Sequence, residues 1–303
     1  MIRRTSAAVA SCAALLAALS PLNAALGPDE PTVRFHLVAT NGSGGPSVRD
    51  LSSTDLELTA DDGRSVAVKS VAQAAPPKIL ALLDISVSVI PASATPLVLD
   101  ILDRGLFRRL QQTDRVRFGA ISRVLTLGDS FSSDRAVLFR QARSVASNDN
   151  KLRYGPSPLW DVLDDAVTLL EKEGGRRAIV LFSDGEATGN VKSRQSVIDH
   201  ASRADVSVSV IGALVRQIGA RRQLQSVAEQ TGGRYVDGPR PGDLRPIRDL
   251  ATDGLASILD DLHHAHVVEI DLPAGVSTIS VRSRSSKVFV AFRQLTFGST
   301  SPR

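Results

Sequence analysis

Residues 78–88 read KILALLDISVS, and this stretch joins an apolar strand to a polar end. The five consecutive apolar residues at 79–83 are typical of a strand that is buried on both faces of a parallel sheet. Asp84, Ser86 and Ser88 follow at alternate positions, so a carboxylate and two hydroxyl groups emerge where the strand ends. Open α/β sheets bind their ligands at this end of the strands. The stretch therefore predicts an α/β fold and a ligand site together.

Strand and helix patterns alternate from residue 78 to about residue 262. Strands are predicted at residues 79–83, 115–121, 124–127, 178–182, 206–211 and 234–236. Helices are predicted at residues 96–111, 134–145, 158–171, 221–230 and 244–262. This alternation predicts a doubly wound, mainly parallel α/β sheet.

The segments on either side of this region have β-strand patterns. Residues 32–75 alternate with period two and contain Asp62-Gly63, a strong hairpin signal. Residues 266–296 contain three further strand patterns. Because neither segment is large enough to form a stable sheet alone, we expect them to pair in one small antiparallel domain. The α/β domain, residues 78–262, would then be an insertion in that domain.

The polar residues at two strand ends are expected to meet. In a sheet of order 3-2-1-4-5-6, the ligand crevice lies between the first and fourth strands. Asp84 ends the first strand, and Asp184 follows the fourth. Two carboxylates with nearby hydroxyl groups form an all-oxygen set, which Mg²⁺ prefers.

These motifs together resemble the metal-ion-dependent adhesion site of von Willebrand factor type A (VWA) domains. Asp84, Ser86 and Ser88 match its Asp-x-Ser-x-Ser motif, and Asp184 in SDG matches its later aspartate. Ser157, in GPSPLWDV, stands where the family usually has a threonine. The resemblance, closest to bacterial VWA-related secreted proteins, covers most of the chain. It implies a VWA fold, Mg²⁺ (or Mn²⁺ or Ca²⁺) held by these five residues, and a partner protein that offers an Asp or Glu to the metal.

The same residues also have ordinary structural explanations. Ser157 could cap a helix that begins at Pro158, and Asp184 with its following glycine could form a turn. The two serines after Asp84 could be solvated loop residues, and we expect Glu186 to be a solvated loop charge. A metal-free VWA scaffold is therefore the main alternative to a metal-binding module.

A second cluster of possible ligands lies in the sequence DDLHHAH. Its members are Asp260, Asp261, His263, His264 and His266. They could bind zinc or serve a hydrolase, or they could simply mark a helix end, where histidine is favoured by the dipole. His36 and His200 have no evident partner in the sequence, and no nucleophile motif appears in a suitable context. We therefore do not expect an enzyme.

Residues 1–25 have the pattern of a secretory signal peptide. Arg3-Arg4 precedes an apolar stretch at residues 5–19, and Ala24-Ala25 offers a cleavage site. The apolar stretch is too short to span a bilayer comfortably. Export to the periplasm or the medium is therefore expected, with no transmembrane helix after cleavage.

The composition agrees with an exported globular protein. The only cysteine, Cys12, lies in the leader, so the mature chain would contain no disulfide. VASC around Cys12 superficially resembles a lipoprotein cleavage box, but the apolar stretch continues beyond it. The net charge of +4 would fall to +2 with the leader removed, and the arginines are scattered. This pattern does not indicate a nucleic-acid partner.

Overall fold

The computed structural model describes residues 31–42, 44–86, 95–147, 155–212, 215, 217–238, 246–290 and 293–296. The predicted signal peptide, residues 1–25, and the predicted ligand Ser88 lie outside the described residues.

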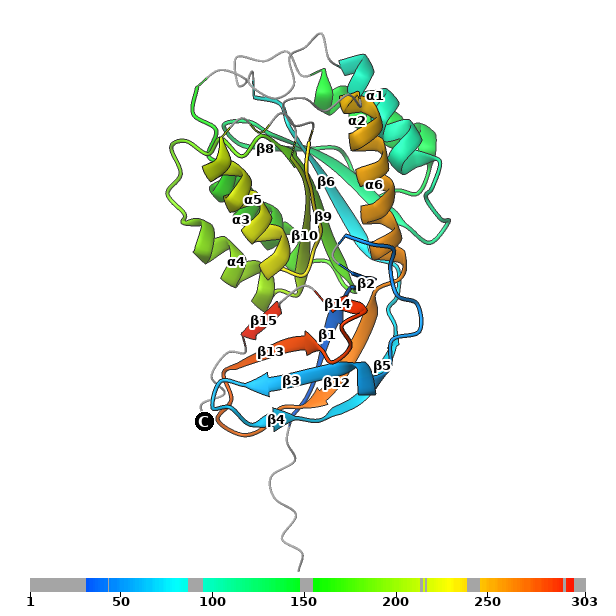
Figure 1. Cartoon of the computed structure of the whole chain (residues 1–303). Helices are drawn as coiled ribbons and strands as arrows, with labels where there is room; N and C mark the ends of the chain where they lie inside the picture. The colour runs from blue at the N-terminus through cyan, green and yellow to red at the C-terminus, as the bar shows by residue number, and fades with distance from the viewer. Residues whose placement is uncertain are drawn as a thin grey trace, which may run out of the picture. The chain divides into compact units, whose positions relative to one another are not determined.

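A six-stranded sheet forms the centre of the α/β unit (Figure 1). Its strands are β6 (Lys78–Asp84), β7 (Arg115–Ile121), β8 (Leu125–Leu127), β9 (Arg177–Ser183), β10 (Val206–Gly212) and β11 (Tyr235–Val236). The order across the sheet is β11-β10-β9-β6-β7-β8, and only β8 pairs antiparallel. Numbered within this unit, the order is the expected 3-2-1-4-5-6, and the prediction of a doubly wound, mainly parallel sheet is confirmed.

The central strand β6 owes its place to its apolar run. It pairs in parallel with β7 on one side and β9 on the other. Its alternate side chains enter two separate cores: Ile79, Ala81 and Leu83 pack on one face of the sheet, and Leu80 and Leu82 on the other. All five are buried, because a strand between two layers of helices has no solvated face.

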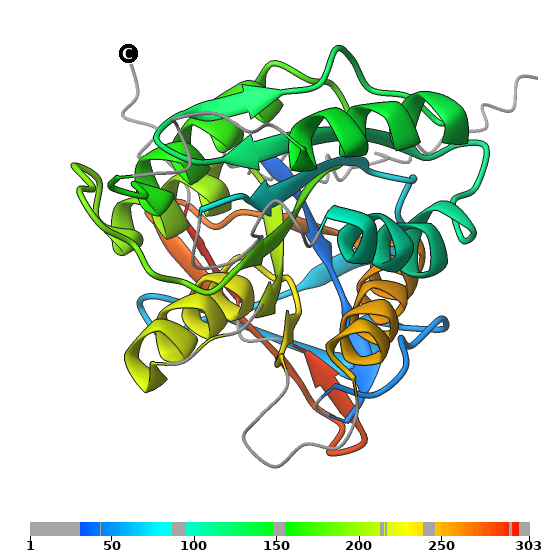
Figure 2. The ribbon, with the colours of Figure 1, turned by 90° about the horizontal axis from the view of Figure 1, so that it is seen from above.

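Helices cover both faces of this sheet (Figures 1 and 2). The core on one face is formed with α1 (Thr95–Leu102), α2 (Arg135–Ala146) and α6 (Ile247–His263). The core on the other face is formed with α3 (Leu159–Glu171), α4 (Arg194–Arg203) and α5 (Ile218–Gln230).

Two helices differ from the prediction. The helix expected at residues 96–111 is shorter, because α1 passes into a π-helical turn at Asp103–Phe107. Gly105 in this turn approaches α6 so closely that a Cβ atom there would lie 2.8 Å from the Cβ of Leu255. The helix α4 was not predicted, because it is mostly polar and only a short apolar stripe that includes Val197 and Ala201 is buried.

The two flanking segments form small antiparallel sheets around a core of their own (Figure 1). One sheet has the order β1-β12-β5, with β1 (Thr32–Leu37), β12 (His266–Asp271) and β5 (Val68–Gln73). Another has the order β15-β13-β3-β4, with β15 (Arg293–Thr296), β13 (Thr278–Ser283), β3 (Leu56–Ala60) and β4 (Ser65–Val66). A third pairs β14 (Val288–Val290) with β2 (Ala39–Asn41). The α/β sheet is thus inserted into an antiparallel β structure, as the fold prediction states.

The hairpin signal at Asp62-Gly63 lies at a tight turn between β3 and β4. Gly63 has a φ of +84°, which only glycine adopts readily, and its amide donates to the carbonyl of Ala60. Beyond the turn, the chain continues through β4 into β5, which belongs to a different sheet. One short segment therefore connects two of the sheets that enclose this core.

Candidate metal-binding site

Two buried carboxylates lie at the ends of neighbouring strands. Asp84 is the last residue of β6, and Asp184 directly follows β9. The two strands are paired in parallel, with Leu83 opposite Phe182. Both carboxylates are buried, so the sheet brings together the two acidic residues that the sequence analysis singled out.

The Asp84 carboxylate is held by groups of its own chain. One oxygen accepts from the amide of Ser86 at 3.0 Å, and the other accepts from the hydroxyl of Ser183 at 2.7 Å. Burial raises the pKa of the Asp84 carboxyl to about 6; hydrogen bonds from Ser86 and Ser183 oppose this shift, and the nearby Asp184 adds to it. The negative charge is therefore only partly compensated by the protein.

Ser183 is a component of the site that the sequence analysis did not identify. Its hydroxyl donates to Asp84 and accepts from the amide of Gly185 at 3.0 Å, so it joins the ends of β6 and β9. The signal was present as a hydroxyl residue directly before Asp184. Because Ser183 is the last residue of the strand pattern, the sequence does not distinguish it from an ordinary strand residue.

Ser157 lies two residues before α3 and has an unusual environment. Its side chain is 8% exposed, and its hydroxyl oxygen has no hydrogen-bond partner among the described residues. The backbone of Ser157 is bound to Thr188 in both directions: its amide donates to the Thr188 hydroxyl at 3.0 Å, and its carbonyl accepts from the Thr188 amide at 2.9 Å. Ser157 is thus fixed against the loop that follows Asp184.

The helix-cap explanation of Ser157 is wrong. The helix α3 begins at Leu159, and no side chain of the residue before it caps the helix. Instead, the side chain of Asn190 accepts from the amide of Trp160 at 2.7 Å. The orphan amide at the start of α3 is therefore satisfied by the neighbouring loop, which leaves the Ser157 hydroxyl free for another ligand.

A second set of hydrogen bonds joins the loop after β9 to α3, and here the loop amides donate to a side chain of the helix. The carboxylate of Asp161, in the first turn of α3, accepts from the amides of Val191 at 2.9 Å and Lys192 at 2.6 Å. The described residues before α3, the first turn of α3 and the loop after β9 are thus held together by hydrogen bonds at the carboxyl edge of the sheet. Thr188 and Asn190 belong to no recognisable motif, and Asp161, although it lies in the GPSPLWDV stretch, was not identified as a residue that supports the site.

The described residues fit a hard divalent cation. Asp84, Asp184 and Ser157 supply two carboxylates and a buried hydroxyl without a partner, and Ser86 adds a hydroxyl hydrogen-bonded to Asp84. A buried, unsatisfied hydroxyl carries a desolvation cost of about 1–3 kcal/mol, which a ligand would relieve. An all-oxygen set of this kind suits Mg²⁺ better than softer metals.

The histidine-rich segment does not form a common site. Each histidine has a different partner. His263 contacts the carboxylate of Asp114, and His264 contacts the carboxylate of Asp260. His266 is hydrogen-bonded to the backbone carbonyl of Arg49. Among the described residues, no group of three or more His, Cys, Asp or Glu side chains is placed to hold a metal ion. The zinc interpretation of this segment is therefore wrong: α6 ends at His263, and the three histidines bind separate partners where the chain passes into β12.

His36 and His200 do have partners, contrary to the sequence analysis. The Nδ1 atom of His36 is bound to the carboxylate of Asp205. The Nδ1 atom of His200 lies 2.7 Å from Asp164, and its Nε2 atom lies 3.3 Å from Glu171. Both ring nitrogens of His200 are thus engaged by carboxylates of α3, which gives this histidine a bracing role between α4 and α3.

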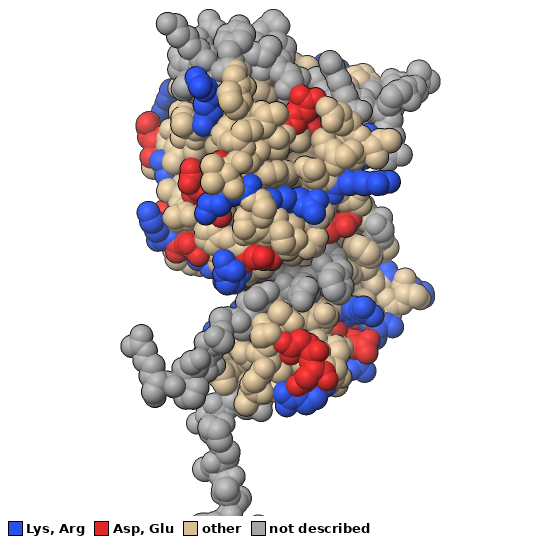
Figure 3. Space-filling model, turned by 90° about the vertical axis from the view of Figure 1, so that its left-hand side faces the viewer, with Lys and Arg blue, Asp and Glu red and all other residues tan. Residues whose placement is uncertain are grey.

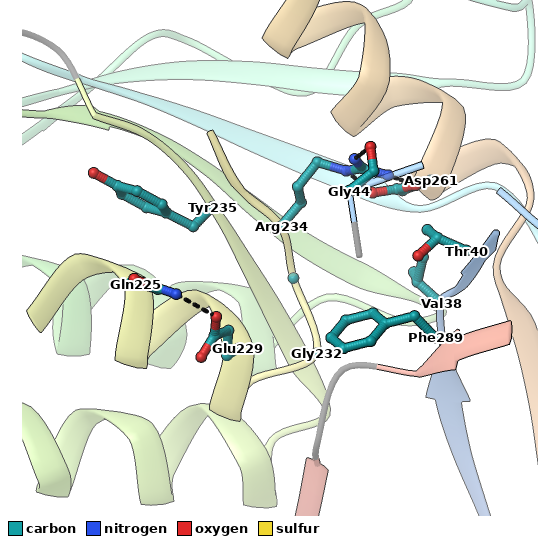
Figure 4. A pocket seen from close by; sticks show the side chains of 11 residues that line it. Val38, Thr40, Gly44, Gln225, Glu229, Gly232, Arg234, Tyr235, Asp261 and Phe289 are labelled. Carbon is teal, nitrogen blue, oxygen red and sulfur yellow. Dashed lines mark hydrogen bonds and ion pairs between the residues drawn. The ribbon is translucent and has the colours of Figure 1, made fainter. Parts of the chain in front are cut away.

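A cavity of about 160 Å³ lies elsewhere, at the junction between the α/β unit and the β segments (Figure 4). Its walls include Tyr235 and Phe289 but none of the predicted metal ligands. The guanidinium group of Arg234 in this cavity already binds the Asp261 carboxylate twice and the carbonyls of Gly44 and Gly45. The Arg234 guanidinium group thus stabilises the junction, and the Glu229 carboxylate in the same cavity accepts from the side-chain amide of Gln225 at 2.7 Å.

No protein-family model and no curated protein matches the chain. Several solved structures are similar to it. A von Willebrand factor type A protein from Catenulispora acidiphila is 9% identical, with a TM-score of 0.49, over 89% of this chain and 74% of that one. An aerotolerance-related membrane protein from Bacteroides fragilis is 16% identical, with a TM-score of 0.43, over 61% of this chain and 98% of that one. The VWA domain of SpRpn10 is 14% identical, with a TM-score of 0.41, over 58% of this chain and 93% of that one.

The strand order and the helices on both faces of the sheet define the architecture independently of these values. The α/β unit has the doubly wound arrangement that the resemblance to VWA domains implies. None of these three similarities reaches 25% identity or a TM-score of 0.5, so they carry no conclusion about the role of this chain. The binding properties of this VWA-like unit have to be argued from its own residues.

Two further observations concern the surface. Within the described ranges, no helix combines the length and the apolar character needed to cross a membrane. On the face that Figure 3 shows, Lys and Arg side chains are interspersed with Asp and Glu side chains. That face therefore lacks the extended basic surface by which proteins bind nucleic acid.

Proposed function

We propose that the chain is a metal-dependent protein-binding module whose site lies at the carboxyl edge of the VWA-like sheet. The observation that carries this proposal is the buried Ser157 hydroxyl, which has no hydrogen-bond partner in the described part of the chain and lies on a segment bound to the loop that follows Asp184. An unsatisfied buried hydroxyl is rare in folded proteins and calls for an explanation. A cation ligated by Ser157, Asp84 and Asp184 provides one.

Asp84, Ser86, Ser157 and Asp184 would hold the ion, and Ser88 would complete the set. Mg²⁺ bound there would supply a coordination position for a carboxylate oxygen of a partner protein. The chain's own contribution is to fix these oxygens before binding: Ser183 joins the two strand ends, and Thr188 fixes the backbone of Ser157. Such preorganisation lowers the cost of ordering the site when a partner arrives.

Thermal unfolding tests the metal requirement. If the dissociation constant is about 1 mM, 10 mM Mg²⁺ stabilises the folded state by about 1.4 kcal/mol, which raises the midpoint by a few degrees. Mn²⁺ should act similarly, and Zn²⁺ at equal concentration should not exceed them. A midpoint that is identical in EDTA, Mg²⁺ and Mn²⁺ would contradict the proposal.

A metal-free scaffold is the second candidate, and one observation favours it. Asp84 already receives hydrogen bonds from Ser86 and Ser183, so the site can persist without an ion. In that case, partner binding would be the same in Mg²⁺ and in EDTA, and the thermal midpoint would not respond to either.

Export forms part of the proposal, and it rests on the leader at residues 1–25. We expect cleavage near Ala24 or Ala25, which discards Cys12. N-terminal sequencing of the exported protein checks this expectation. A chain that begins at a lipid-modified Cys12 would make it a lipoprotein, and an intact Met1 would make the leader an anchor.

A further inference from the structure

Large apolar side chains are exposed around the candidate site. Among the large hydrophobic residues that the structure describes, the three most exposed are Val191 at 91%, Ile218 at 71% and Val124 at 52%. Each follows the carboxyl end of a sheet strand: Val191 comes after β9, Ile218 after β10, and Val124 between β7 and β8. We call these three side chains the apolar rim.

One member of the rim, Val191, lies on the loop that contains Asp184, and a second, Ile218, lies beside that loop. The amide of Val191 donates to Asp161 in the first turn of α3, four residues beyond Ser157. Ile218 begins α5, and the first turn of that helix lies against the same loop. A Cβ atom on Gly185 would lie 3.2 Å from the Cβ of Ala220.

The third member belongs to the hairpin beside Asp84. The carbonyl of Ile121 accepts from the amide of Ile85 at 3.0 Å, which places the hairpin next to the end of β6. The neighbouring Arg123 is exposed, and its side chain forms no ion pair or hydrogen bond within the described residues. Its Nε atom lies 3.5 Å from the position of a Cβ on Gly155, two residues before Ser157. An unpaired positive charge therefore lies beside the rim.

We propose that the apolar rim is the docking surface for the partner, and that the partner presents a carboxylate flanked by apolar side chains. This inference rests on the proposed function and deepens it. Exposed apolar side chains that gather at one end of a molecule mark an interaction site. Arg123 and a bound cation both favour an acidic group at the centre of the contact, while Val191 and Ile218 offer apolar area on both sides of it.

The rim is held in place before any partner binds. Two backbone amides of the Val191 loop are fixed by Asp161, and Asn190 of that loop is bound to Trp160. A second copy of the chain is a poorer occupant, because a two-fold contact through this surface would bring two unpaired Arg123 cations into one interface without adding a carboxylate partner for either. The rim therefore suits a different protein segment.

The test uses two fluorescein-labelled synthetic peptides, Gly-Gly-Leu-Asp-Leu-Gly-Gly and Gly-Gly-Ser-Asp-Ser-Gly-Gly, measured by fluorescence polarisation in 10 mM MgCl₂ and in EDTA. The wild type should bind the leucine peptide at least tenfold more tightly than the serine peptide. The double variant Val191→Ser/Ile218→Ser should lose this preference and keep its calorimetric response to Mg²⁺. Phe289→Ser, a change of an exposed apolar residue on β14, is the matched control and should keep both.

The outcomes separate this inference from the proposed function. Equal binding of the two peptides, or no binding of either, by a wild type that still binds Mg²⁺ overturns the rim proposal alone. If the wild type prefers the leucine peptide in EDTA as well and shows no calorimetric heat with Mg²⁺, the rim proposal is supported and the proposed metal site is overturned. Binding of the wild type, but not of the double variant, to phosphatidylcholine vesicles without a peptide preference would make the rim a membrane contact. A dimer in sedimentation that Val191→Ser abolishes would make it a contact between copies, and either result overturns the proposal.

Discussion

At the scale of single residues, Ser157 distinguishes a ligand site from ordinary loop structure. Its hydroxyl is buried and has no partner within the ranges that the structure describes, whereas the buried hydroxyl of Ser183 makes two hydrogen bonds. Replacing each by alanine should therefore have different effects. Ser157→Ala should leave the metal-free protein as stable as the wild type or about 1 kcal/mol more stable, since a desolvated group is removed. Ser183→Ala should cost about 1–3 kcal/mol, because its partners are left unsatisfied.

Ser157→Ala should also weaken the thermal stabilisation by Mg²⁺. Ser157→Thr, which keeps the hydroxyl, should preserve that stabilisation. Urea denaturation in EDTA and thermal shifts in Mg²⁺ check both parts. A Ser157→Ala variant that is destabilised in EDTA by as much as Ser183→Ala would show that the hydroxyl has a structural partner after all.

The sequence contained the carboxylates of this site but not the way in which they are held. Asp84 and Asp184 could be placed together because parallel strands present their carboxyl ends at one edge. The helix-cap explanation of Ser157 could not be rejected from the sequence, because Asn190, which binds the start of α3, is 33 residues away along the chain. Hydrogen bonds between distant loops leave no periodic pattern.

At the scale of secondary-structure elements, the helix α3 supports the segment that contains Ser157. Asp164 of α3 joins this helix to α4 and to the loop after β9. This carboxylate binds His200 of α4 at 2.7 Å and Lys192 of the loop after β9 at 3.2 Å. Although partial burial acts to raise it, the hydrogen bonds from His200 and Lys192 lower the pKa of the Asp164 carboxyl below its ordinary value.

This shift makes the contribution of Asp164 dependent on pH. A carboxyl whose pKa is lowered on folding stabilises the protein above its unfolded pKa of about 4, and the stabilisation is lost as the pH falls through the lower folded value. Asp164→Asn should thus cost about 1–2 kcal/mol at pH 7, and the difference should shrink below pH 4. Asp199→Asn is the control, because this half-buried carboxylate accepts only from Gln195 of the same helix among the described residues. A cost in urea denaturation that does not change with pH would contradict this account.

The elements with a strong apolar pattern were predicted well, and the weak ones were not. All six strands of the main sheet were found near their predicted positions because they are apolar and bounded by polar loops. The helix α4 was missed because only a short stripe of it is buried. The early end of α1 depends on the close approach of Gly105 to α6, a tertiary contact that the local sequence does not encode.

At the scale of the whole molecule, the N-terminal β segment depends on residues that follow the α/β unit. The strand β12 lies between β1 and β5, so it supplies hydrogen bonds to both. A chain that ends at Leu262 lacks β12 and β13, and its residues 32–74 should then be cut readily by trypsin, because an unpaired segment of this size is not stable alone. Equal protection of residues 32–74 in the truncated and the full-length chain would refute this dependence.

The central claim is that the two strand ends and the Ser157 loop form a divalent-cation site, and titration calorimetry tests it most directly. Mg²⁺ titrated into the metal-free protein should give a saturable heat with one site per chain. Asp84→Ala, whose folding is checked by circular dichroism, should give none, while the control Asp199→Asn should behave like the wild type. The absence of a saturable heat from the wild type with both Mg²⁺ and Mn²⁺, or an equal heat from Asp84→Ala, would contradict the claim.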